Sequence, residues 1–451
     1  MAKKVIIIGA GPAGLAVAKK ISKDKRAEVT IVDMGKEAEK RYCPERENKE
    51  CLSCIPCNKL YGGGGAGLMS DGKLLFHPGI GNNLEEVLEI SKNLGLIEDV
   101  RTFFSEYGIS QVREKSKEVE ELERKALNNE IDFIYPNPTH IGSDRLPKLI
   151  ARVQSDLEAQ GVRFEYGRKV KDLDGLKSEF KPDFIVLATG RVSVGTGWME
   201  SILKKEGLEY TFRPVDIGVR VEVPHQISDP LTDLTRDLKF YIRTKCNGDA
   251  VRTFCTCPKG QVVRESYGNF NIVNGEASES TSRHSKNTNF SILTTIPLTE
   301  PLANPNIAAK LVAESFYEYG GGKIMAQRFG DTQKKPAGRS KKSKLGQYVL
   351  QPTLEDVTWG DIRLPMGARY WQDIEEMIIR LNSVMPGVAS GQTILYAPEI
   401  KFHGLKIKTD ECLHAGKGIY VTGDGAGLSR GIVGAMASGF LAAEGILKGL
   451  Y

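Results

Sequence analysis

The chain has 451 residues, of which 40% are hydrophobic and 26% are charged. This length and composition provide for two or three domains with hydrophobic cores and argue against large-scale disorder. The net charge of +5 is smaller than nucleic-acid-binding proteins usually carry. An apolar run near the C-terminus is interrupted by Glu444, so it is too short to span a bilayer. We expect a cytoplasmic protein that does not associate with membranes and does not have nucleic acid as its main partner.

The first forty residues have the pattern of a dinucleotide-binding β-α-β unit. An apolar run at residues 3–8 runs directly into Gly9, Gly11 and Gly14, and a second apolar run ends in Asp33, 19 residues after Gly14. In this motif the first glycine makes the tight turn, the second lets a pyrophosphate approach the backbone, and the third lets the helix pack on the strand. A carboxylate at the position of Asp33 can bind the adenosine ribose hydroxyls.

Two distant segments favour FAD over NAD as the dinucleotide. Residues 184–190 form a second buried-strand pattern that ends in Ala188, Thr189 and Gly190, and it is preceded by a strand candidate at residues 161–166. Near the C-terminus, a strand candidate leads into a glycine-rich turn at residues 423–427 and then into a helix of small residues. The chain holds only one clear nucleotide fingerprint, so we do not expect a dedicated NAD(P)H domain.

This layout resembles the flavoprotein superfamily of glutathione reductase and p-hydroxybenzoate hydroxylase, and residues 1–35, 184–191 and 419–445 carry the resemblance. The resemblance implies that Asp424 holds the ribityl or pyrophosphate part of one FAD. It also implies that the helix beginning at Gly431 and Ile432 points its N-terminus at the flavin, where a helix dipole stabilises the anion of reduced flavin.

Three further segments, residues 62–74, 140–146 and 252–260, sharpen the resemblance. Together they are similar to the largely uncharacterised FAD-dependent dehydrogenases with the signature Gly-Gly-Ala-Gly-x-x-Ser-Asp-Gly-Lys-Leu. The similarity spans most of the chain and implies a flavin and a redox reaction. The chain departs from the usual C-terminal Gly-Glu-Gly-Ala-Gly of that family by having Asp424, a conservative change.

The expected fold class is α/β, with a Rossmann-like FAD-binding domain built from discontinuous segments and an inserted mixed α+β substrate domain. We expect FAD-binding segments at residues 1–82, 136–214 and 411–451, a helical insertion at residues 83–135, and the substrate or cap domain at residues 215–410. Strands are expected at residues 216–223 and 290–295, and helices at residues 306–319 and 370–384, from their apolar periodicity.

The glycine loop at residues 62–67 can bring backbone close to a ligand and is expected to contact the isoalloxazine or the pyrophosphate, with a flexible hinge as the alternative. With this loop included, the residues expected to contact FAD are Gly9, Gly11, Pro12, Ala13, Gly14, Asp33, Gly64, Gly65, Ala66, Gly67, Val170, Ala188, Thr189, Gly190, Gly423, Asp424, Gly431 and Ile432.

Four of the eight cysteines, Cys43, Cys51, Cys54 and Cys57, lie close together in the sequence. Short loops between thiolates at such intervals can direct the sulfurs to one centre. Three interpretations compete: a [4Fe-4S] cluster, a structural zinc ion, and a set of disulfides or unliganded thiols. The position of this segment between Asp33 and the glycine loop favours a cluster that relays electrons to FAD, and a cytoplasmic location argues against disulfides.

Candidate catalytic residues are few. Lys73 follows the glycine loop and is expected near flavin N1 and O2 or on a substrate anion. Cys255 and Cys257 form a further pair of cysteines, and only one of them is expected to face the flavin. His284 lies in a donor-rich run that can bind an anion, with a solvated loop as the alternative.

Residues 334–344 carry six positive charges and no acid. A mobile solvated loop is the favoured interpretation, ahead of a site for an anionic substrate or partner and of an RNA-binding segment. No aromatic residue is interleaved to stack on bases.

The sequence predicts an FAD-dependent oxidoreductase, a dehydrogenase or reductase, that acts at flavin N5 on a small organic substrate, an anionic substrate being one alternative. A Cys-ligated centre is expected to relay electrons. Ferredoxin or NAD(P)H is the expected electron donor, and the protein can be an oligomer. The alternatives are a flavin-dependent RNA-modifying enzyme and a noncatalytic protein that binds FAD or zinc.

Overall fold

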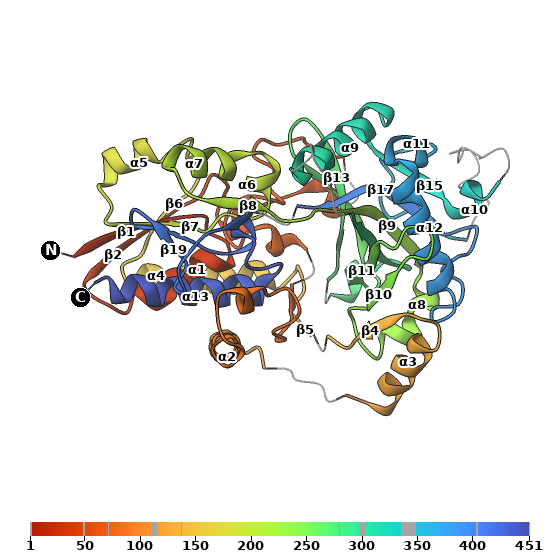
Figure 1. The fold of residues 1–451 in the computed structure, drawn as a ribbon, viewed down its shortest axis with the longest axis horizontal. Helices are drawn as coiled ribbons and strands as arrows, with labels where there is room; N and C mark the ends of the chain where they lie inside the picture. The colour runs from red at the N-terminus through yellow and green to blue at the C-terminus, as the bar shows by residue number, and fades with distance from the viewer. Residues whose placement is uncertain are drawn as a thin grey trace.

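The protein is described by a computed structural model that covers residues 2–47, 50–70, 72–110, 115–136, 138–278, 280–296, 304–334, 349–402 and 405–450. Two bodies lie side by side, each built on its own β-sheet (Figure 1). We call them the parallel body, on a six-stranded sheet, and the antiparallel body, on an eight-stranded sheet. Among the described residues, no helix combines the length and apolar character needed to cross a membrane.

The sheet of the parallel body is assembled from three distant parts of the chain. All neighbouring strands are parallel except the edge pair β19 and β20. Apolar strands such as β1 are buried on both faces, as a parallel sheet covered by helices requires. In spatial order the strands are β19 (His414–Gly416), β20 (Ile419–Val421), β7 (Phe184–Leu187), β1 (Lys3–Ile8), β2 (Ala27–Val32) and β6 (Arg163–Glu165).

Helices cover both faces of this sheet (Figure 1). On one face, α1 packs along α13 and against α4, and α2 packs on the outer side of α13. This arrangement confirms the predicted α/β fold with a Rossmann-like unit made of discontinuous segments. The helices are α1 (Pro12–Ile21), α2 (Ile90–Glu106), α4 (Leu146–Ala159) and α13 (Ile432–Lys448) on that side, and α5 (Leu173–Phe180), α6 (Val192–Gly195) and α7 (Trp198–Glu206) towards the other.

The sheet of the antiparallel body consists mainly of residues that lie between β7 and β20 in the chain. Only β15 and β16 pair in parallel, and β4, from the segment before residue 135, forms one edge. Its order is β16 (Val357–Trp359), β15 (Ile324–Arg328), β17 (Ile394–Lys401), β9 (Asp216–Pro224), β14 (Asn287–Thr295), β11 (Ala250–Cys257), β10 (Lys239–Arg243) and β4 (Asp132–Ile134).

The helices of the antiparallel body pack around this sheet, and α12 lies against β9, β11 and β14. The predicted helices at residues 306–319 and 370–384 are observed as α9 and α12, which confirms the periodicity argument. The helices are α3 (Lys117–Leu127), α8 (His225–Thr232), α9 (Pro305–Tyr319), α10 (Phe329–Thr332), α11 (Arg363–Met366) and α12 (Ala368–Leu381).

Three two-stranded sheets and several short 3-10 helices complete the described chain. The small sheets are β3 (Lys73–Leu74) with β5 (Thr139–His140), β8 (Tyr210–Phe212) with β18 (Leu405–Ile407), and β12 (Gln261–Ser266) with β13 (Asn271–Glu276). The 3-10 helices are η1 (Ala38–Lys40), η2 (Pro44–Glu47), η3 (Ala66–Met69), η4 (Leu84–Glu86), η5 (Thr281–Arg283) and η7 (Asp424–Ala426).

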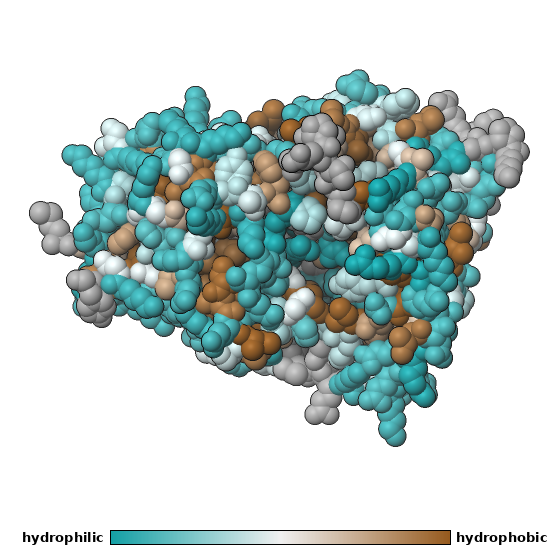
Figure 2. All heavy atoms as spheres, in the orientation of Figure 1, coloured by the Kyte–Doolittle hydropathy of each residue, from teal (hydrophilic) through white to brown (hydrophobic). Residues whose placement is uncertain are grey.

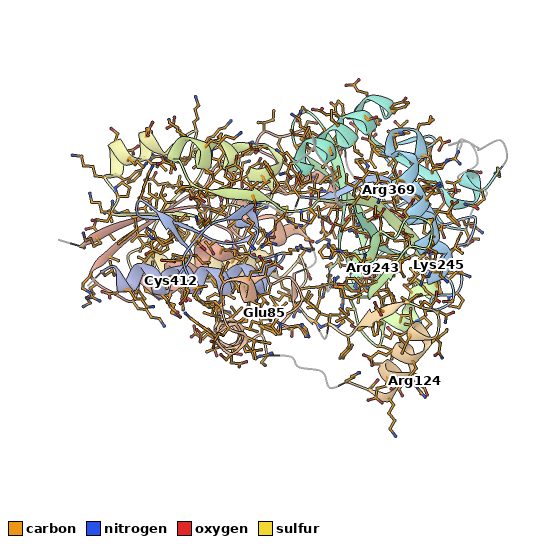
Figure 3. The ribbon with its side chains drawn as sticks, in the orientation of Figure 1. Glu85, Arg124, Arg243, Lys245, Arg369 and Cys412 are labelled. Carbon is orange, nitrogen blue, oxygen red and sulfur yellow. The ribbon has the colours of Figure 1, made fainter. Side chains whose placement is uncertain are left out.

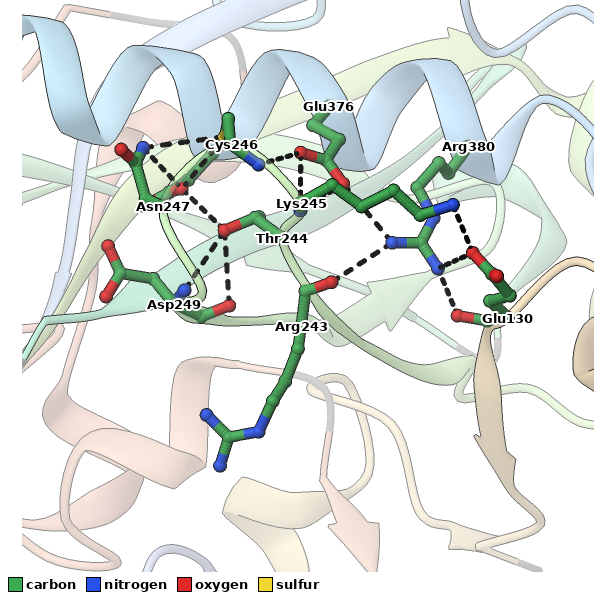
Figure 4. A network of polar contacts seen from close by, with 10 residues as sticks. Glu130, Arg243, Thr244, Lys245, Cys246, Asn247, Asp249, Glu376 and Arg380 are labelled. Carbon is green, nitrogen blue, oxygen red and sulfur yellow. Dashed lines mark hydrogen bonds and ion pairs between the residues drawn. The ribbon is translucent and has the colours of Figure 1, made fainter.

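The turn between β10 and β11 is tied to α12 by polar contacts (Figure 4). The Glu376 carboxylate accepts the backbone N–H groups of Lys245, at 2.8 Å, and Cys246, at 3.1 Å. Arg369 of the same helix forms a two-pronged ion pair with Asp249, at 2.6 and 2.7 Å. These contacts fix the ends of β10 and β11, and both strands carry side chains of the site described below.

Candidate functional site

A cavity of about 1020 Å³ lies between the two bodies, and the largely hydrophilic face drawn in Figure 2 is hollowed between them. This volume is at the upper end for ligand sites. Most of the residues predicted to contact FAD line it, although they come from segments hundreds of residues apart: Gly9, Gly11, Pro12, Ala13, Asp33, Gly65, Ala66, Gly67, Val170, Ala188, Thr189, Gly190, Gly423, Asp424, Gly431 and Ile432.

The three fingerprint glycines have different surroundings. A Cβ on Gly14 would lie 2.0 Å from the Gly9 oxygen, and one on Gly9 would lie 2.6 Å from the Ala188 oxygen, so both positions exclude a side chain by packing. A Cβ on Gly11 would instead meet nothing closer than 3.7 Å. Gly11 faces the cavity and precedes α1, whose N-terminus has no side-chain cap. An anion can therefore bind the helix N-terminus there.

Asp33 follows β2 at the carboxyl edge of the parallel sheet. Its Oδ2 accepts the Ala10 N–H at 2.9 Å and its Oδ1 accepts the Gly35 N–H at 2.8 Å. These two bonds hold the carboxylate beside the fingerprint turn and in the lining of the cavity. Each carboxylate oxygen has a second lone pair, so Asp33 can also accept ribose hydroxyls.

The glycine loop is organised by Arg41, a residue that the sequence analysis missed. The buried Arg41 guanidinium donates to the carbonyls of Gly63 at 2.8 Å, Gly65 at 2.7 Å, Lys59 at 2.9 Å and Asn58 at 2.8 Å. Burial lowers the pKa of Arg41 to about 10, which leaves it charged at neutral pH. In the sequence Arg41 is a single arginine 21 residues before Gly62, and it belongs to no motif.

Gly64 does not line the cavity, in contrast to Gly65, Ala66 and Gly67. Its N–H donates to the Ala10 oxygen at 2.9 Å, and a Cβ there would press on Leu68 at 2.7 Å. Gly64 thus joins the glycine loop to the fingerprint turn, while Gly65, Ala66 and Gly67 form the surface.

The other end of the cavity is formed by Asp424 and the start of α13. Asp424 Oδ1 accepts the Ser429 hydroxyl at 2.6 Å and the Gly431 N–H at 3.3 Å, and Arg191 Nε lies 3.4 Å from Oδ2. The N-terminus of α13, like that of α1, has no side-chain cap. Two uncapped helix N-termini therefore open on one cavity, an arrangement suited to an anionic ligand such as a dinucleotide.

Of the three predicted catalytic residues, Lys73 and Cys255 line the cavity and His284 does not. Lys73 is buried, donates to the Thr256 carbonyl and lies 3.6 Å from Asp237. His284 lines a separate depression, and its Nε2 lies 3.1 Å from the Ser278 oxygen.

Cys255 lies at a β-bulge of β11, with φ of 49°. This left-handed conformation is uncommon for residues with a Cβ and is concentrated at functional sites. Arg220, fully buried beneath the sheet, donates to the Cys255 carbonyl at 3.1 Å. Cys257 is buried and does not line the cavity, so the two cysteines have different surroundings. Residues two apart on a regular strand share one face, and the bulge between Phe254 and Cys257 breaks this alternation.

The predicted metal centre is not supported. All eight cysteines belong to the described residues and are free, and within the described part of the chain no three His, Cys, Asp or Glu side chains form a metal-binding group. Cys43 is buried, which raises the pKa of its thiol to about 11, and burial also raises the pKa of Cys57. Spacing brings cysteines near one another along the chain, but it does not set the direction of their sulfurs.

The other cysteines are dispersed. Cys412 lies on the parallel body, far from the labelled residues of α12 (Figure 3), whereas Cys246 contacts α12 (Figure 4). The predicted basic loop falls outside the described residues except for Lys334, which pairs with Asp331. Asp71 of the signature also lies outside them.

The antiparallel body contributes a wall of strand residues to the cavity. Lys239 and Tyr241 come from β10, Arg252 and Phe254 from β11, and Lys401 from the end of β17. Behind this wall, Glu399 forms a two-pronged ion pair with Arg220, at 2.7 and 2.8 Å. Although burial opposes it, the Arg220 and Lys401 charges lower the pKa of Glu399 to about 2.

A comparison with known families matches residues 214–401 to the family described as "FAD-dependent protein, C-terminal domain-like". The matched segment contains most strands of the antiparallel sheet. This match supports FAD as the cofactor and a flavoprotein as the class. It covers the body that the sequence analysis assigned to the substrate, not the glycine fingerprint.

An uncharacterized protein of Clostridium beijerinckii is 23% identical over 474 residues, which cover 98% of this chain and 80% of that protein. Among solved structures, the tetrameric form of 2-methyl-3-hydroxypyridine-5-carboxylic acid oxygenase has a TM-score of 0.36 at 12% identity, covering 99% of this chain and 83% of the other. CtdE in complex with FAD has a TM-score of 0.34 at 11% identity, covering 98% and 84%. Scores this low do not establish a common fold, so the architecture rests on the topology of this chain.

Proposed function

We propose that the protein is an FAD-dependent oxidoreductase, a dehydrogenase or reductase of a small organic substrate. One observation carries the proposal. The segments predicted to hold FAD and the sheet matched to an FAD-dependent family line the same cavity. The cavity is large, and two uncapped helix N-termini open on it.

The residues present fit a dinucleotide. The N-terminus of α1 beside Gly11 would bind the pyrophosphate, because its N–H groups and dipole favour an anion. Asp33 would accept the adenosine ribose hydroxyls, and Asp424 with the N-terminus of α13 would hold the flavin end. When bound, FAD supplies a ring that exchanges hydride or electrons with the substrate.

On the substrate side, Cys255 is the candidate for direct contact with the substrate, because it lines the cavity on the bulge of β11. Lys73 acts on the same segment, since its bond to the Thr256 carbonyl holds the residue next to Cys255. In this proposal Lys73 is a positioning residue. The proposal gives no role to His284, which lines the other depression.

No step in this proposal passes through an iron-sulfur cluster or zinc ion, because the described cysteines do not form a ligand group. In the reductase direction the electrons would come from a diffusing donor such as ferredoxin or NAD(P)H. In the dehydrogenase direction the substrate would supply them, and reduced FAD would pass them to a diffusing acceptor.

The test is the flavin content of the purified protein and of Gly11→Val. A Cβ at Gly11 fits the fold, whereas the added methyl groups occupy the approach to the α1 N-terminus. We expect wild-type protein to bind FAD with a flavin absorption spectrum, and Gly11→Val to bind it about tenfold more weakly or worse. The control is Gly95→Ala, because a Cβ on Gly95 meets nothing within 4 Å.

Thermal unfolding of the flavin-free variants shows whether a variant that does not bind FAD is still folded. Metal and acid-labile sulfide analysis of the same samples tests the rejected cluster. Equal FAD affinity of Gly11→Val and Gly95→Ala would overturn the proposed location of the pyrophosphate, and absence of any FAD binding by the wild type would overturn the proposed function.

A further inference from the structure

The part of the cavity formed by the antiparallel body contains three cations around one aromatic ring. The ring is that of Phe254, which is only half-buried and lines the cavity. Lys239 Nζ lies 4.4 Å from its centroid, the Arg252 guanidinium carbon 5.0 Å, and Lys401 Nζ 5.9 Å. We call Lys239, Arg252, Lys401 and Phe254 the cationic wall.

The two lysines of the cationic wall are buried. Lys239 is 2% exposed and Lys401 is 4% exposed, and both residues belong to strands rather than loops. Burying an ammonium or guanidinium group is costly unless an anion compensates it. Buried ammonium and guanidinium groups are therefore expected where an anion binds them.

Described carboxylates pair with the cations of the wall. Asp237 pairs with Lys239 at 2.7 Å and also lies 3.6 Å from Lys73, and Asp216 pairs with Arg252. Lys239 and Arg252 therefore each have a carboxylate partner in the lining of the cavity.

The carboxylate next to Lys401 is shared in the same way. Glu399 lies 2.8 Å from Lys401 Nζ, but both of its oxygens are already bound by the Arg220 fork. One carboxylate therefore serves two cations, and positive charge remains on the Lys401 side of the wall. Lys401 also donates to Asn274 Oδ1 at 3.3 Å.

Arg430 adds a further cation from the parallel body. It lines the same cavity, and its Nε is buried without a hydrogen-bond partner among the described residues. Burial and the neighbouring Arg252 charge lower the pKa of Arg430 to about 10, and it stays charged at neutral pH. Of the other carboxylates in the lining, Asp33 accepts the N–H groups of Ala10 and Gly35, Asp424 pairs with Arg191, and Glu265 accepts from Asn274 Nδ2 at 2.6 Å.

Apolar and aromatic side chains lie among these charges. Besides Phe254, the side chains of Tyr241, Ile400 and Phe402 line the cavity. A ligand that fits such a surface has an apolar body, which contacts the rings, and a carboxylate, which accepts hydrogen bonds from ammonium and guanidinium groups.

We propose that the cationic wall, with Arg430, is the substrate subsite and that it binds an aromatic carboxylate. This inference deepens the proposed function and rests on it for the role of the ligand as substrate. The carboxylate is held by Lys401 and Arg430, the cations whose charge the chain compensates least, and the ring packs on Phe254.

Benzoate is the probe, and calorimetric titration of FAD-loaded and flavin-free protein is the measurement. Benzyl alcohol has the same ring without the charge, and inorganic phosphate has charge without the ring. We expect benzoate to bind, and both comparison compounds to bind at least about tenfold more weakly.

Lys401→Met is the decisive variant, because Arg220 still neutralises Glu399 after the substitution. Lys408→Met is the matched control, since Lys408 is 71% exposed and pairs with Glu209 at the surface. We expect Lys401→Met to weaken benzoate binding about tenfold or more and Lys408→Met to leave it unchanged. Lys401→Arg should restore most of the affinity, because it restores the charge.

Equal benzoate affinity in Lys401→Met and Lys408→Met overturns the inference, and so does binding of benzyl alcohol or phosphate as tight as that of benzoate. Binding of FAD without binding of benzoate would support the proposed function and overturn this inference. Binding of benzoate through Lys401 by a protein that does not bind FAD would overturn the proposed function and support the subsite.

Discussion

At the scale of single residues, the site depends on side chains that hold backbone rather than ligand. Arg41 binds four carbonyls, two of them in the glycine loop and two at Asn58 and Lys59, and so fixes the loop relative to the segment before it. Hydrogen bonds from a charged donor contribute about 1.5–3 kcal/mol each. A loop of consecutive glycines has high conformational entropy when free, so an external anchor of this kind matters more than it would for other loops.

Replacing Arg41 by methionine should therefore weaken FAD binding about tenfold or more without removing any group predicted to contact FAD. Fluorescence titration with FAD measures the effect. Arg41→Lys retains the charge but loses the planar guanidinium that donates to four carbonyls. Its affinity for FAD should fall between those of Arg41→Met and the wild type. Arg26→Met, which removes an arginine paired with Asp24 at the surface, is the control. Wild-type affinity in Arg41→Met would show that the loop does not need its anchor.

At the scale of secondary-structure elements, the parallel body relies on the close crossing of α1 and α13. A Cβ on Gly439 would lie 2.4 Å from the Ala13 oxygen and 2.9 Å from the Ala16 Cβ. The small residues that identified α13 in the sequence thus have a definite role, because they let two helices approach with their backbones nearly in contact. This crossing also places both uncapped N-termini on the cavity.

Gly439→Ala should lower the free energy of unfolding by about 1–3 kcal/mol, because the added methyl group forces α13 away from α1. Gly95→Ala is the matched control in α2, where a methyl group meets no neighbour and should stabilise the helix by about 0.5–1 kcal/mol. Urea unfolding of the two variants should therefore give changes of opposite sign, and a stabilised Gly439→Ala would contradict the crossing.

The cysteine segment shows where element-level patterns mislead. Its spacing predicted a metal centre, whereas the structure shows buried ion pairs in the same segment. Lys59 Nζ lies 2.8 Å from Glu45 Oε2, and Arg264 of β12 lies 3.0 Å from Glu45 Oε1. Arg46 pairs with Glu276 of β13 at 2.8 Å. The residues between the cysteines thus attach the segment to the antiparallel body.

At the scale of the whole molecule, these ion pairs join the two bodies beside the cavity. Glu45 and Lys59 are almost fully buried, with side chains 5% and 3% exposed. The Lys73 bond to the Thr256 carbonyl makes a second connection between the bodies. The cavity needs both bodies in a fixed position relative to each other, because each contributes part of its lining.

Glu45→Ala should destabilise the protein by about 3–5 kcal/mol, since it leaves Lys59 and Arg264 buried without their shared carboxylate. The control is Glu98→Ala, which breaks a surface pair with Arg101 and should change stability by no more than about 0.5 kcal/mol. Thermal unfolding measures the difference, and limited proteolysis shows whether the bodies separate first. Equal effects of the two substitutions would mean that the buried pairs do not join the bodies.

Much of the parallel body could be predicted from the sequence. The glycine fingerprint, Asp33 and the apolar strands are local patterns, and the structure places Gly11, Asp33 and Asp424 on one cavity as expected. The four cysteines could not be interpreted correctly in the same way, because metal ligation depends on side-chain direction. Arg41 could not be found, because its partners are backbone carbonyls that any residue provides.

The sequence by itself determined what neighbouring residues control: where strands and helices form, where a turn must be glycine, and which turn can approach a pyrophosphate. Only the tertiary structure decided which side chains meet. Lys239, Arg252, Lys401 and Arg430 come from separate strands and a distant turn, and the order of strands in the sheet brings them to one wall. The physical reason is range: backbone hydrogen bonding and periodicity act over a few residues, whereas the convergence of charges follows from the packing of the whole chain.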